Sequence, residues 1–481
     1  MNKTVAIIGA GAGGLPAAVA LAEKGVNVKI IERGDYLYKD DIRTNKFDYE
    51  LGTPPWIKHS TEWQGPFELQ RGIGLGGSTL YFQGVSHMPP DSVIERWGLP
   101  TAEITKLKNE VVNFLQIAGE VQPAHKLNTI SSRMLDSAKQ LSWKVRHAPV
   151  AILSRPHDER PACNYCGLCV FGCRPGDKSS AEKTWLPRAL KTGRVEILSN
   201  AKVNSLILAD KTTVKHISIT QQTKTFELPV NAVVVSAGAL ETPYLLRHSN
   251  QALAPDGIGN KNVGRYLTGS IWQSLLLSVD EESARGYAGI PIDILVEEFT
   301  EKGILLSQGR NQAGITGPIS AARMLMREGY QGDVRAWMRK NYSRLVGIGG
   351  YAESSTSFED GIGGTKAKTF VKSLNDSDTE MIKKIRKALV QWSTATKAKI
   401  ILPLGNVKYP VVGAMLRGTC RLGADPETSA VNSSGQLRGY DNIYISDASI
   451  IGRGLIANPS LMLQVLGLYV GRKCADRLMN A

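Results

Sequence analysis

The sequence predicts an α/β protein in which a doubly wound, Rossmann-like domain is interleaved with a second domain. Three observations support this fold class. Residues 4–32 read as an apolar strand, a glycine-rich turn, an alanine-rich helix and a second apolar strand. The length of 481 residues exceeds what one compact core usually holds, so we expect two domains. No linker rich in Pro, Gly or Ser divides the chain, so the two domains are expected to alternate along it.

The first element is the glycine-rich turn inside "TVAIIGAGAGGLPAAVALAEKGVNVKIIERG". It reads Gly9-x-Gly11-x-x-Gly14 and lies between the first strand and the helix. There, glycines permit a tight bend and let backbone N–H groups approach a pyrophosphate. Glu32 ends the second strand, where a carboxylate accepts hydrogen bonds from an adenosine ribose and repels a 2′-phosphate. The motif predicts a bound dinucleotide, but alone it does not choose between FAD and NAD.

Two later stretches favour FAD. "GIGLGGSTLYFQG" is a second glycine-rich turn around Gly76, Gly77 and Ser78, and its small residues would let a large flat ring approach the backbone. "NAVVVSAGALETPYLLRHSN" reads as a buried strand that enters a turn at Ala237 and then a helix. We predict that these residues contact the cofactor.

A third stretch, "DNIYISDASIIGRGLIANPSLMLQVLGLYVGRKCADRL", has the same implication. It reads as a strand, an acidic turn at Asp447, and an amphipathic helix opened by Pro459 with Asn458 as its cap. The N-terminus of this helix, directed at a flavin, would stabilise negative charge on the reduced ring. We predict cofactor contacts at all three residues.

The composition is that of an ordinary globular protein, with 42% hydrophobic and 21% charged residues. The chain has no run of about 18 apolar residues, and it opens directly on a strand without a signal segment. We therefore expect a cytoplasmic protein, although a partner that carries an export signal could still move it folded.

The formal net charge of +14 favours anionic partners. Nucleic acid is a poor candidate because the sequence shows no zinc-finger spacing, no aromatic-rich basic strand and no recognition helix. An anionic membrane surface or an acidic redox partner fits the charge better, and scattered solubilising Lys and Arg fit it equally well.

A cysteine run, "ACNYCGLCVFGCRPG", holds Cys163, Cys166, Cys169 and Cys173. The spacing C-x2-C-x2-C-x3-C is close to the run that holds iron–sulfur clusters in bacterial ferredoxins, so we predict these four as metal ligands. Zinc is less expected because the sequence has no second C-x2-C knuckle. Disulfides are also less expected, because neighbouring cysteines in one short loop mostly cannot reach the Cα separation and dihedral that a disulfide needs. Reduced thiols packed in a loop remain an open alternative.

These blocks, in this order and across nearly the whole chain, resemble the glucose-methanol-choline (GMC) family of FAD-dependent oxidoreductases. The resemblance rests on the N-terminal fingerprint, "GGST", "SAGALETPYLL", "GTCRLGADPETSAVNSSGQLRGYDNIYISDAS" and "NPSLMLQVLGL". It implies extended FAD in the doubly wound domain, and an α+β substrate domain whose antiparallel sheet caps the flavin. It also implies that Val203 of "NAKVNSL" meets the adenine and that Asp447 meets the ribityl and phosphate region.

The resemblance divides the chain coarsely. The FAD-binding domain is expected to comprise residues 1–90, 190–265 and 420–481. The substrate domain would comprise residues 91–189, which carry the cysteine loop 163–173, and residues 266–419. Within the second of these segments, an amphipathic surface helix is predicted to begin between Asp376 and Thr379.

The cysteine loop resembles a subset of the same family. "CNYCGLCVFGCRPGDKSSAEKTWLPRAL" is similar to a segment of long-chain alcohol oxidases and, more loosely, of flavoprotein subunits of sugar and sugar-acid dehydrogenases. In some of those dehydrogenases a C-x5-C-x3-C set holds a [3Fe-4S] cluster, and Cys163, Cys169 and Cys173 reproduce that spacing. Cys166 could complete a [4Fe-4S] cluster. The resemblance implies an electron relay, while the alcohol oxidases show such a loop without one.

One departure from the family is important. The family has a catalytic His three residues before the "GT" of "GTC", and here Met415 stands there, which cannot accept a proton usefully at neutral pH. His87 and Tyr409 are the candidates for a replacement base. Lys408 and Arg417 lie close in sequence to the same segment, but are expected to be solvated charges.

Other polar residues have two interpretations each. Asn458 lies where the family has its second active-site residue, so it is predicted to hydrogen-bond the substrate, or else only to cap its helix. Arg453 could bind an anionic substrate or solvate its loop. Cys420 and Cys474 are expected to be small buried hydrophobes.

Together these features predict an FAD-dependent oxidoreductase, a dehydrogenase rather than an oxidase, that transfers hydride from a CH–OH group to flavin N5. Its substrate would be an alcohol, a sugar or a polyol, and its electrons would pass through an iron–sulfur cluster to a protein or small subunit. Two alternatives remain open because the base is missing. One is altered chemistry, as in a desaturase, reductase or lyase, and the other is a silent FAD-binding subunit of a complex.

Overall fold

A computed structural model describes most of the chain. The described residues are 3–36, 57–59, 70–249, 252–254, 256–280, 285–309, 317–327, 329–354, 362–363, 369–370, 375–404, 415–456 and 458–480. In this part of the chain no helix combines the length and the apolar character needed to span a lipid bilayer.

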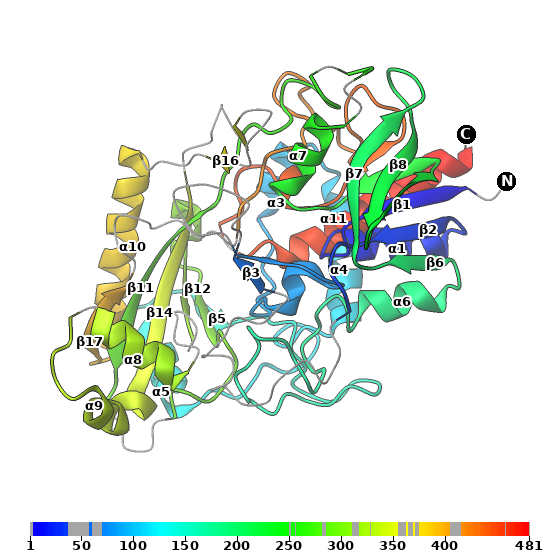
Figure 1. The fold of residues 1–481 in the computed structure, drawn as a ribbon. Helices are drawn as coiled ribbons and strands as arrows, with labels where there is room; N and C mark the ends of the chain where they lie inside the picture. The colour runs from blue at the N-terminus through cyan, green and yellow to red at the C-terminus, as the bar shows by residue number, and fades with distance from the viewer. Residues whose placement is uncertain are drawn as a thin grey trace.

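A five-stranded parallel sheet forms one end of the molecule (Figure 1). Its strand order is β18-β10-β1-β2-β6, with bounds Ile443–Ile445, Ala232–Val235, Thr4–Ile8, Asn27–Ile31 and Val195–Leu198. The strands β18, β10 and β1 are almost wholly apolar and buried, as in a parallel sheet covered on both faces, whereas the edge strand β6 has no buried residue. The predicted doubly wound α/β domain is therefore present.

Helices and a small meander cover this sheet. The helix α1 (Gly14–Glu23) follows β1 directly and packs against α11 (Ser460–Asn480), which lies more than 400 residues later in the chain. The meander pairs β7 (Ala201–Leu208), β8 (Val214–Gln221) and β9 (Lys224–Pro229) in antiparallel fashion. The other helices of this half are α3 (Asp91–Arg96), α4 (Thr101–Leu115), α6 (Trp185–Lys191) and α7 (Glu241–Arg247).

A six-stranded antiparallel sheet forms the other half, as the family resemblance implied. Its order is β17-β11-β14-β13-β12-β5, with bounds Lys399–Leu404, Ser270–Ser278, Leu345–Glu353, Ile304–Gln308, Ile294–Val296 and Val145–His147. The remaining helices of this half are α5 (Thr129–Gln140), α8 (Pro318–Arg327), α9 (Val334–Asn341) and α10 (Asp376–Ala395). Figure 1 shows α10 at the outer side of the sheet, far from the parallel sheet.

Short elements complete the fold. The two-stranded pairs are β3 (Ile57–His59) with β4 (Gln70–Gly72) and β15 (Ile362–Gly363) with β16 (Thr369–Phe370). The 3-10 turns are η2 (Gly77–Leu80), η3 (Thr300–Lys302), η4 (Tyr342–Arg344) and η5 (Ala448–Ile450).

The chain alternates between the two halves. The parallel sheet takes β1 and β2 from the beginning of the chain, β6 and β10 from its middle, and β18 from its last part. The antiparallel sheet is built from the intervening segments. The exact domain boundaries remain a prediction.

Candidate functional site

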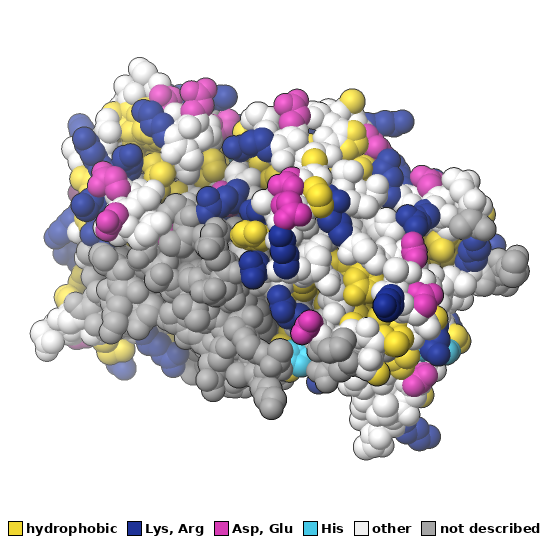
Figure 2. Space-filling model, turned by 90° about the horizontal axis from the view of Figure 1, so that it is seen from above, with side chains coloured by type: hydrophobic (Ala, Val, Ile, Leu, Met, Phe, Trp, Pro, Cys, Tyr) yellow, Lys and Arg dark blue, Asp and Glu magenta, His cyan; other side chains and the backbone are white. Residues whose placement is uncertain are grey.

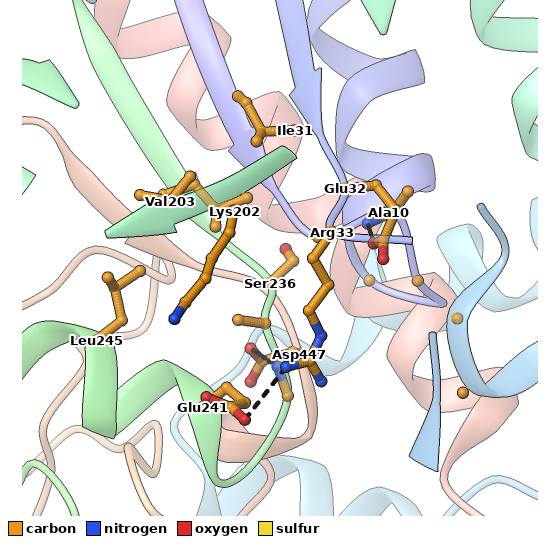
Figure 3. Close-up of a pocket in the computed structure, with 18 of the residues that line it drawn as sticks. Ala10, Ile31, Glu32, Arg33, Lys202, Val203, Ser236, Glu241, Leu245 and Asp447 are labelled. Atoms are coloured by element: carbon orange, nitrogen blue, oxygen red, sulfur yellow. Dashed lines mark hydrogen bonds and ion pairs between the residues drawn. The ribbon is translucent and has the colours of Figure 1, made fainter. Parts of the chain in front are cut away.

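A cavity of about 400 Å³ opens at the carboxyl ends of β1, β2 and β10. This edge of an open α/β sheet is where ligands bind in doubly wound folds. Figure 3 shows Glu32 and Arg33 reaching into it from the end of β2, with Lys202 and Val203 on β7 opposite. Of the residues predicted to contact the cofactor, those on the cavity wall are Gly9, Gly11, Glu32, Gly77, Ser78, Val203, Ala237 and Asp447.

The three glycines of the first turn have different surroundings. Gly9 has a φ of +102°, and a Cβ placed on it would lie 2.3 Å from the carbonyl oxygen of Ser236. A Cβ on Gly14 would lie 2.0 Å from the carbonyl oxygen of Gly9, so this glycine permits close packing of the helix and is not on the cavity wall. A Cβ on Gly11 would meet nothing within 4 Å and would point into open space. Only Gly11 keeps room free for a ligand.

Glu32 joins three backbone segments around the cavity. Its side chain is buried, and its carboxylate accepts hydrogen bonds from the backbone N–H of Ala10 (3.0 Å), Gly34 (3.0 Å) and Gly74 (3.1 Å). A carboxylate has about four lone-pair sites, so one site remains for a further donor. Glu32 thus fixes the shape of the cavity and can still bind a hydroxyl group.

The second glycine-rich turn packs against the first. Gly76 donates its N–H to the carbonyl oxygen of Ala10 at 2.8 Å, and has a φ of +112° that favours glycine. A Cβ on Gly77 would lie 2.9 Å from the Cα atom of Gly11. The two turns therefore face one another, with Ser78 beside them on the cavity wall.

Asp447 closes the opposite side. One carboxylate oxygen accepts from the N–H of Gly238 at 2.8 Å and from the Thr242 hydroxyl, and the other accepts from the N–H of Ser449 at 2.7 Å. Burial raises the pKa of the Asp447 carboxyl, and the hydrogen bonds from Ser449 and Thr242 act in the opposite direction. The residue holds the 237–242 turn in place and faces the cavity.

Sequence reasoning missed an ion-pair cluster on the cavity wall. Arg33 lies 3.4 Å from Glu241 at the start of α7 (Figure 3). Arg71, which is not on the cavity wall, also pairs with this carboxylate. In the sequence, Arg71 follows Arg33 by more than 30 positions, and Glu241 follows Arg71 by more than 160 positions. The position of Arg33 directly after Glu32 was the only sequence signal.

Asn458 and His87 lie on two backbone segments that meet. The hydroxyl of Ser460, the first residue of α11, donates to the carbonyl oxygen of Val85 at 3.1 Å. Burial lowers the pKa of His87 to about 4, so the ring is neutral at physiological pH. Pro459 is the residue before α11, and its carbonyl oxygen accepts a hydrogen bond from the N–H of Leu463. Pro459 therefore takes the N-cap position, and Asn458, which was predicted as the cap, lies one residue before it.

Met415 is buried, and its position in the family's base segment is occupied by an apolar side chain. Tyr409 and Lys408 lie outside the described residues. The expectation that Arg417 is a solvated charge is wrong, because its side chain is fully buried and pairs with Glu353 at 3.0 Å. Arg453 is exposed, at the surface of its loop.

In this structure the four cysteines of the loop are not gathered into a metal site. Cys166 is exposed while Cys169 and Cys173 are buried, and the Cys173 thiol donates to the Asp177 carboxylate. Burial, followed by the nearby Asp177 charge, raises the pKa of the Cys163 and Cys173 thiols. Among the described residues, no group of three or more His, Cys, Asp or Glu side chains is arranged to hold a metal ion.

A buried lysine binds the cysteine loop to the second glycine-rich turn. Lys178 is fully buried, and its ammonium donates to the carbonyl oxygens of Cys169 (2.6 Å), Leu80 (2.8 Å) and Phe82 (3.4 Å). The loop is therefore a packed wall beside the cofactor turn. Cys420 and Cys474 are fully buried among apolar residues, as expected.

Comparison with known proteins gives a consistent result. The N-terminal model of the GMC oxidoreductase family matches residues 12–268, and its C-terminal model matches residues 369–467. A long-chain-alcohol oxidase of Arabidopsis thaliana is 23% identical over 98% of this chain, which spans 67% of that protein. The 2-methyl-1,2-propanediol dehydrogenase of Mycolicibacterium austroafricanum is 24% identical over 98% of this chain and 96% of its own length.

The fold is also found among solved structures. The crystal structure of pyridoxine 4-oxidase from Mesorbium loti superposes with a TM-score of 0.73 and 16% identity, covering 98% of this chain and 99% of the other. At this identity the likeness concerns the fold alone.

Proposed function

The chain belongs to the GMC oxidoreductase family, and from this premise we propose that it is an FAD-dependent dehydrogenase acting on a CH–OH group. The observation that carries the proposal is the cleft at the sheet edge, lined by two facing glycine-rich turns. FAD, when bound, would supply a flavin ring that accepts a hydride at N5. An alcohol, a sugar or a polyol remains the proposed substrate class.

The residues of the cleft fit FAD. Gly11 leaves open space beside the N-terminus of α1, where N–H groups attract a pyrophosphate. Glu32 keeps one lone-pair site for a ribose hydroxyl. The Ser236 hydroxyl lies on the cavity wall, buried and without a partner among the described residues, so it is available to a bound ligand. Val203 and Asp447 would complete the adenine and ribityl ends.

Two residues are proposed to handle the substrate. Asn458 would donate a hydrogen bond to the substrate oxygen, because its side chain has no partner among the described residues and lies near the start of α11. His87 would accept the hydroxyl proton, because burial keeps its ring neutral and its segment contacts that of Asn458. Tyr409 remains the other candidate for this base.

The electron acceptor is proposed to be something other than oxygen. One relative of nearly equal length is a dehydrogenase, which agrees with this direction, while another, the paromamine 6'-oxidase of Streptomyces fradiae, is an oxidase. The cysteine loop adds no support, since the described residues show no metal-binding arrangement there, and no step is assigned to a cluster. Whether the cysteine loop binds a cluster can be measured directly, by determining the iron and labile sulfide per FAD in protein purified without oxygen. An EPR signal of a cluster that is lost in the Cys169→Ser variant would support electron transfer through the cysteine loop.

Altered chemistry is the second candidate, favoured by the apolar Met415 in the family's base position. A desaturase, reductase or lyase of this fold would not need a base there. A silent FAD-binding subunit is the third, and a stoichiometric partner with its own active site, recovered on purification, would favour it.

The test is anaerobic reduction of the bound flavin by a panel of alcohols, sugars and polyols. We expect the visible absorption of the flavin to bleach with at least one of them. Asn458→Ala should slow this reduction by about 10²–10³-fold and His87→Gln by about 10²–10⁴-fold, with FAD still bound. Flavin that no CH–OH donor bleaches would reject the dehydrogenase and favour the altered chemistry.

A further inference from the structure

A buried ion pair connects the two segments that flank the proposed substrate position. The guanidinium of Arg417 donates to the carboxylate of Glu353 at 3.0 Å and to the carbonyl oxygen of Met415 at 3.1 Å. It also donates to the carbonyl oxygen of Leu455, three residues before Asn458. One side chain therefore contacts both the segment of Met415 and the segment of Asn458.

Glu353 strengthens the same connection from the other side. It is the last residue of β14, and its second carboxylate oxygen accepts from the N–H of Gly454 at 2.7 Å. Ser270, which pairs with Glu353 across β11 and β14, receives an Arg417 N–H at 3.3 Å and donates to the carbonyl oxygen of Ile456 at 3.1 Å. Two strands of the antiparallel sheet are thus fastened to the loop that precedes α11.

The chemistry of this pair is poorly suited to stabilising the fold. The Arg417 side chain is 0% exposed and that of Glu353 is 17% exposed, so both charges lose much of their hydration. Removing two charges from water costs about as much as their attraction returns, and apolar replacements are often neutral. The Arg417 Nε has no partner among the described residues, which leaves a further donor unsatisfied. The pair has a better rationale in fixing a geometry.

We propose that Arg417 and Glu353 form a positioning pair that sets the distance between the Met415 segment and the Asn458 segment. The inference rests on the proposed function, because those segments flank the substrate only if the chain oxidises a CH–OH group. Neither residue is proposed to touch the substrate. Hydride transfer depends steeply on the placement of the reacting carbon, so a small change in this distance lowers the rate of the chemical step.

The test removes both charges together, because loss of one alone would leave the other buried and unpaired and could prevent folding. The double variant Arg417→Met/Glu353→Gln should fold, bind FAD and melt close to the wild-type temperature. The rate constant of flavin reduction at saturating substrate should fall at least about tenfold, while KM changes little. Hydrogen exchange should rise in both segments, at residues 415–420 and 452–458, which is a readout independent of activity.

A matched control uses an ion pair away from the site. Arg472 on α11 pairs with Glu110 on α4 at 2.8 Å, and the double variant Arg472→Met/Glu110→Gln should keep the wild-type rate. A folded, FAD-loaded Arg417→Met/Glu353→Gln protein with wild-type reduction and exchange would overturn the proposal. If none of the CH–OH donors reduces the flavin of the wild-type protein, the proposed function fails. The hydrogen-exchange comparison then still tests whether the ion pair couples the two segments.

Discussion

Gly11 and Gly14 belong to one turn, yet the structure gives them opposite constraints. Gly11→Ala should leave the apoprotein as stable as the wild type, since a Cβ there meets nothing within 4 Å, but should weaken FAD binding at least about tenfold by filling the space beside the pyrophosphate. Gly14→Ala should lower the free energy of unfolding by about 3 kcal/mol, because its Cβ would lie 2.0 Å from the carbonyl oxygen of Gly9. Thermal melts of the apoproteins and FAD titrations check both, and equal effects of the two variants would contradict the assignment.

His87 makes stability depend on pH. Burial lowers its pKa in the folded protein to about 4 from a usual 6.5, so the unfolded chain binds more protons between these values. The residue therefore contributes up to about 3 kcal/mol above pH 6.5, and this contribution is lost as the pH falls through 4. Urea unfolding at several pH values measures it. His87→Gln should flatten the curve in that window, and an unchanged curve would show that the ring is not buried in this way.

Single residues also show where sequence reasoning ends. The positions of Glu32 and Asp447 on the cavity wall follow from strand–turn patterns that sequence displays directly. The burial of Arg417 does not, because its partner Glu353 lies 64 positions earlier and only the tertiary fold brings the two together. A lone arginine beside a loop is more often solvated, and that general expectation was wrong here.

At the scale of elements, Lys178 connects the cysteine loop to the second glycine-rich turn. Lys178→Met would leave the carbonyl oxygens of Cys169, Leu80 and Phe82 without their buried donor. We expect a loss of stability on the order of 3 kcal/mol and faster release of FAD, because the second glycine-rich turn loses its anchor. Chemical denaturation and flavin fluorescence measure the two effects. Lys191→Met, at the exposed C-terminal end of α6, is the control and should change neither.

Elements with a strong local pattern were predictable. The strand–turn–helix of β1 and α1 was read directly from residues 4–23, and α10 begins at Asp376, with Asn375 as its cap, where acidic and polar residues precede an amphipathic run. The antiparallel sheet was expected only from the family resemblance. Its longest pairing joins β11 and β14, which lie about 70 residues apart, and no local pattern sets such a register.

The whole molecule carries an excess of cations. On the face seen in Figure 2, Lys and Arg side chains are spread across the surface with acidic residues among them. The helix α9 has no buried residue, and its Arg335, Arg339 and Lys340 are exposed at the far end of the antiparallel half. A surface of this charge complements an anionic bilayer.

We therefore expect the protein to sediment with vesicles that contain anionic lipid, and to be released by high salt. Each cation near the surface contributes about 1 kcal/mol, so Arg335→Glu/Arg339→Glu should weaken binding on the order of 30-fold or more. The pair Lys211→Glu/Lys224→Glu is the matched control, because both lysines are exposed on the β7–β8–β9 meander of the other half. Binding that is equal for neutral vesicles, or insensitive to both double variants, would argue against this surface.

The alternation of the chain has a consequence for its synthesis. The strand β10 pairs with β18, and α1 packs on α11. Both apolar surfaces therefore stay uncovered until residues 443–480 have been synthesised. A nascent chain leaving the ribosome must carry them uncovered while β11 to β17 of the antiparallel half are translated. Chaperones that hold exposed apolar segments are thus expected to meet this protein early, and insertion of the flavin cofactor to follow release from the ribosome.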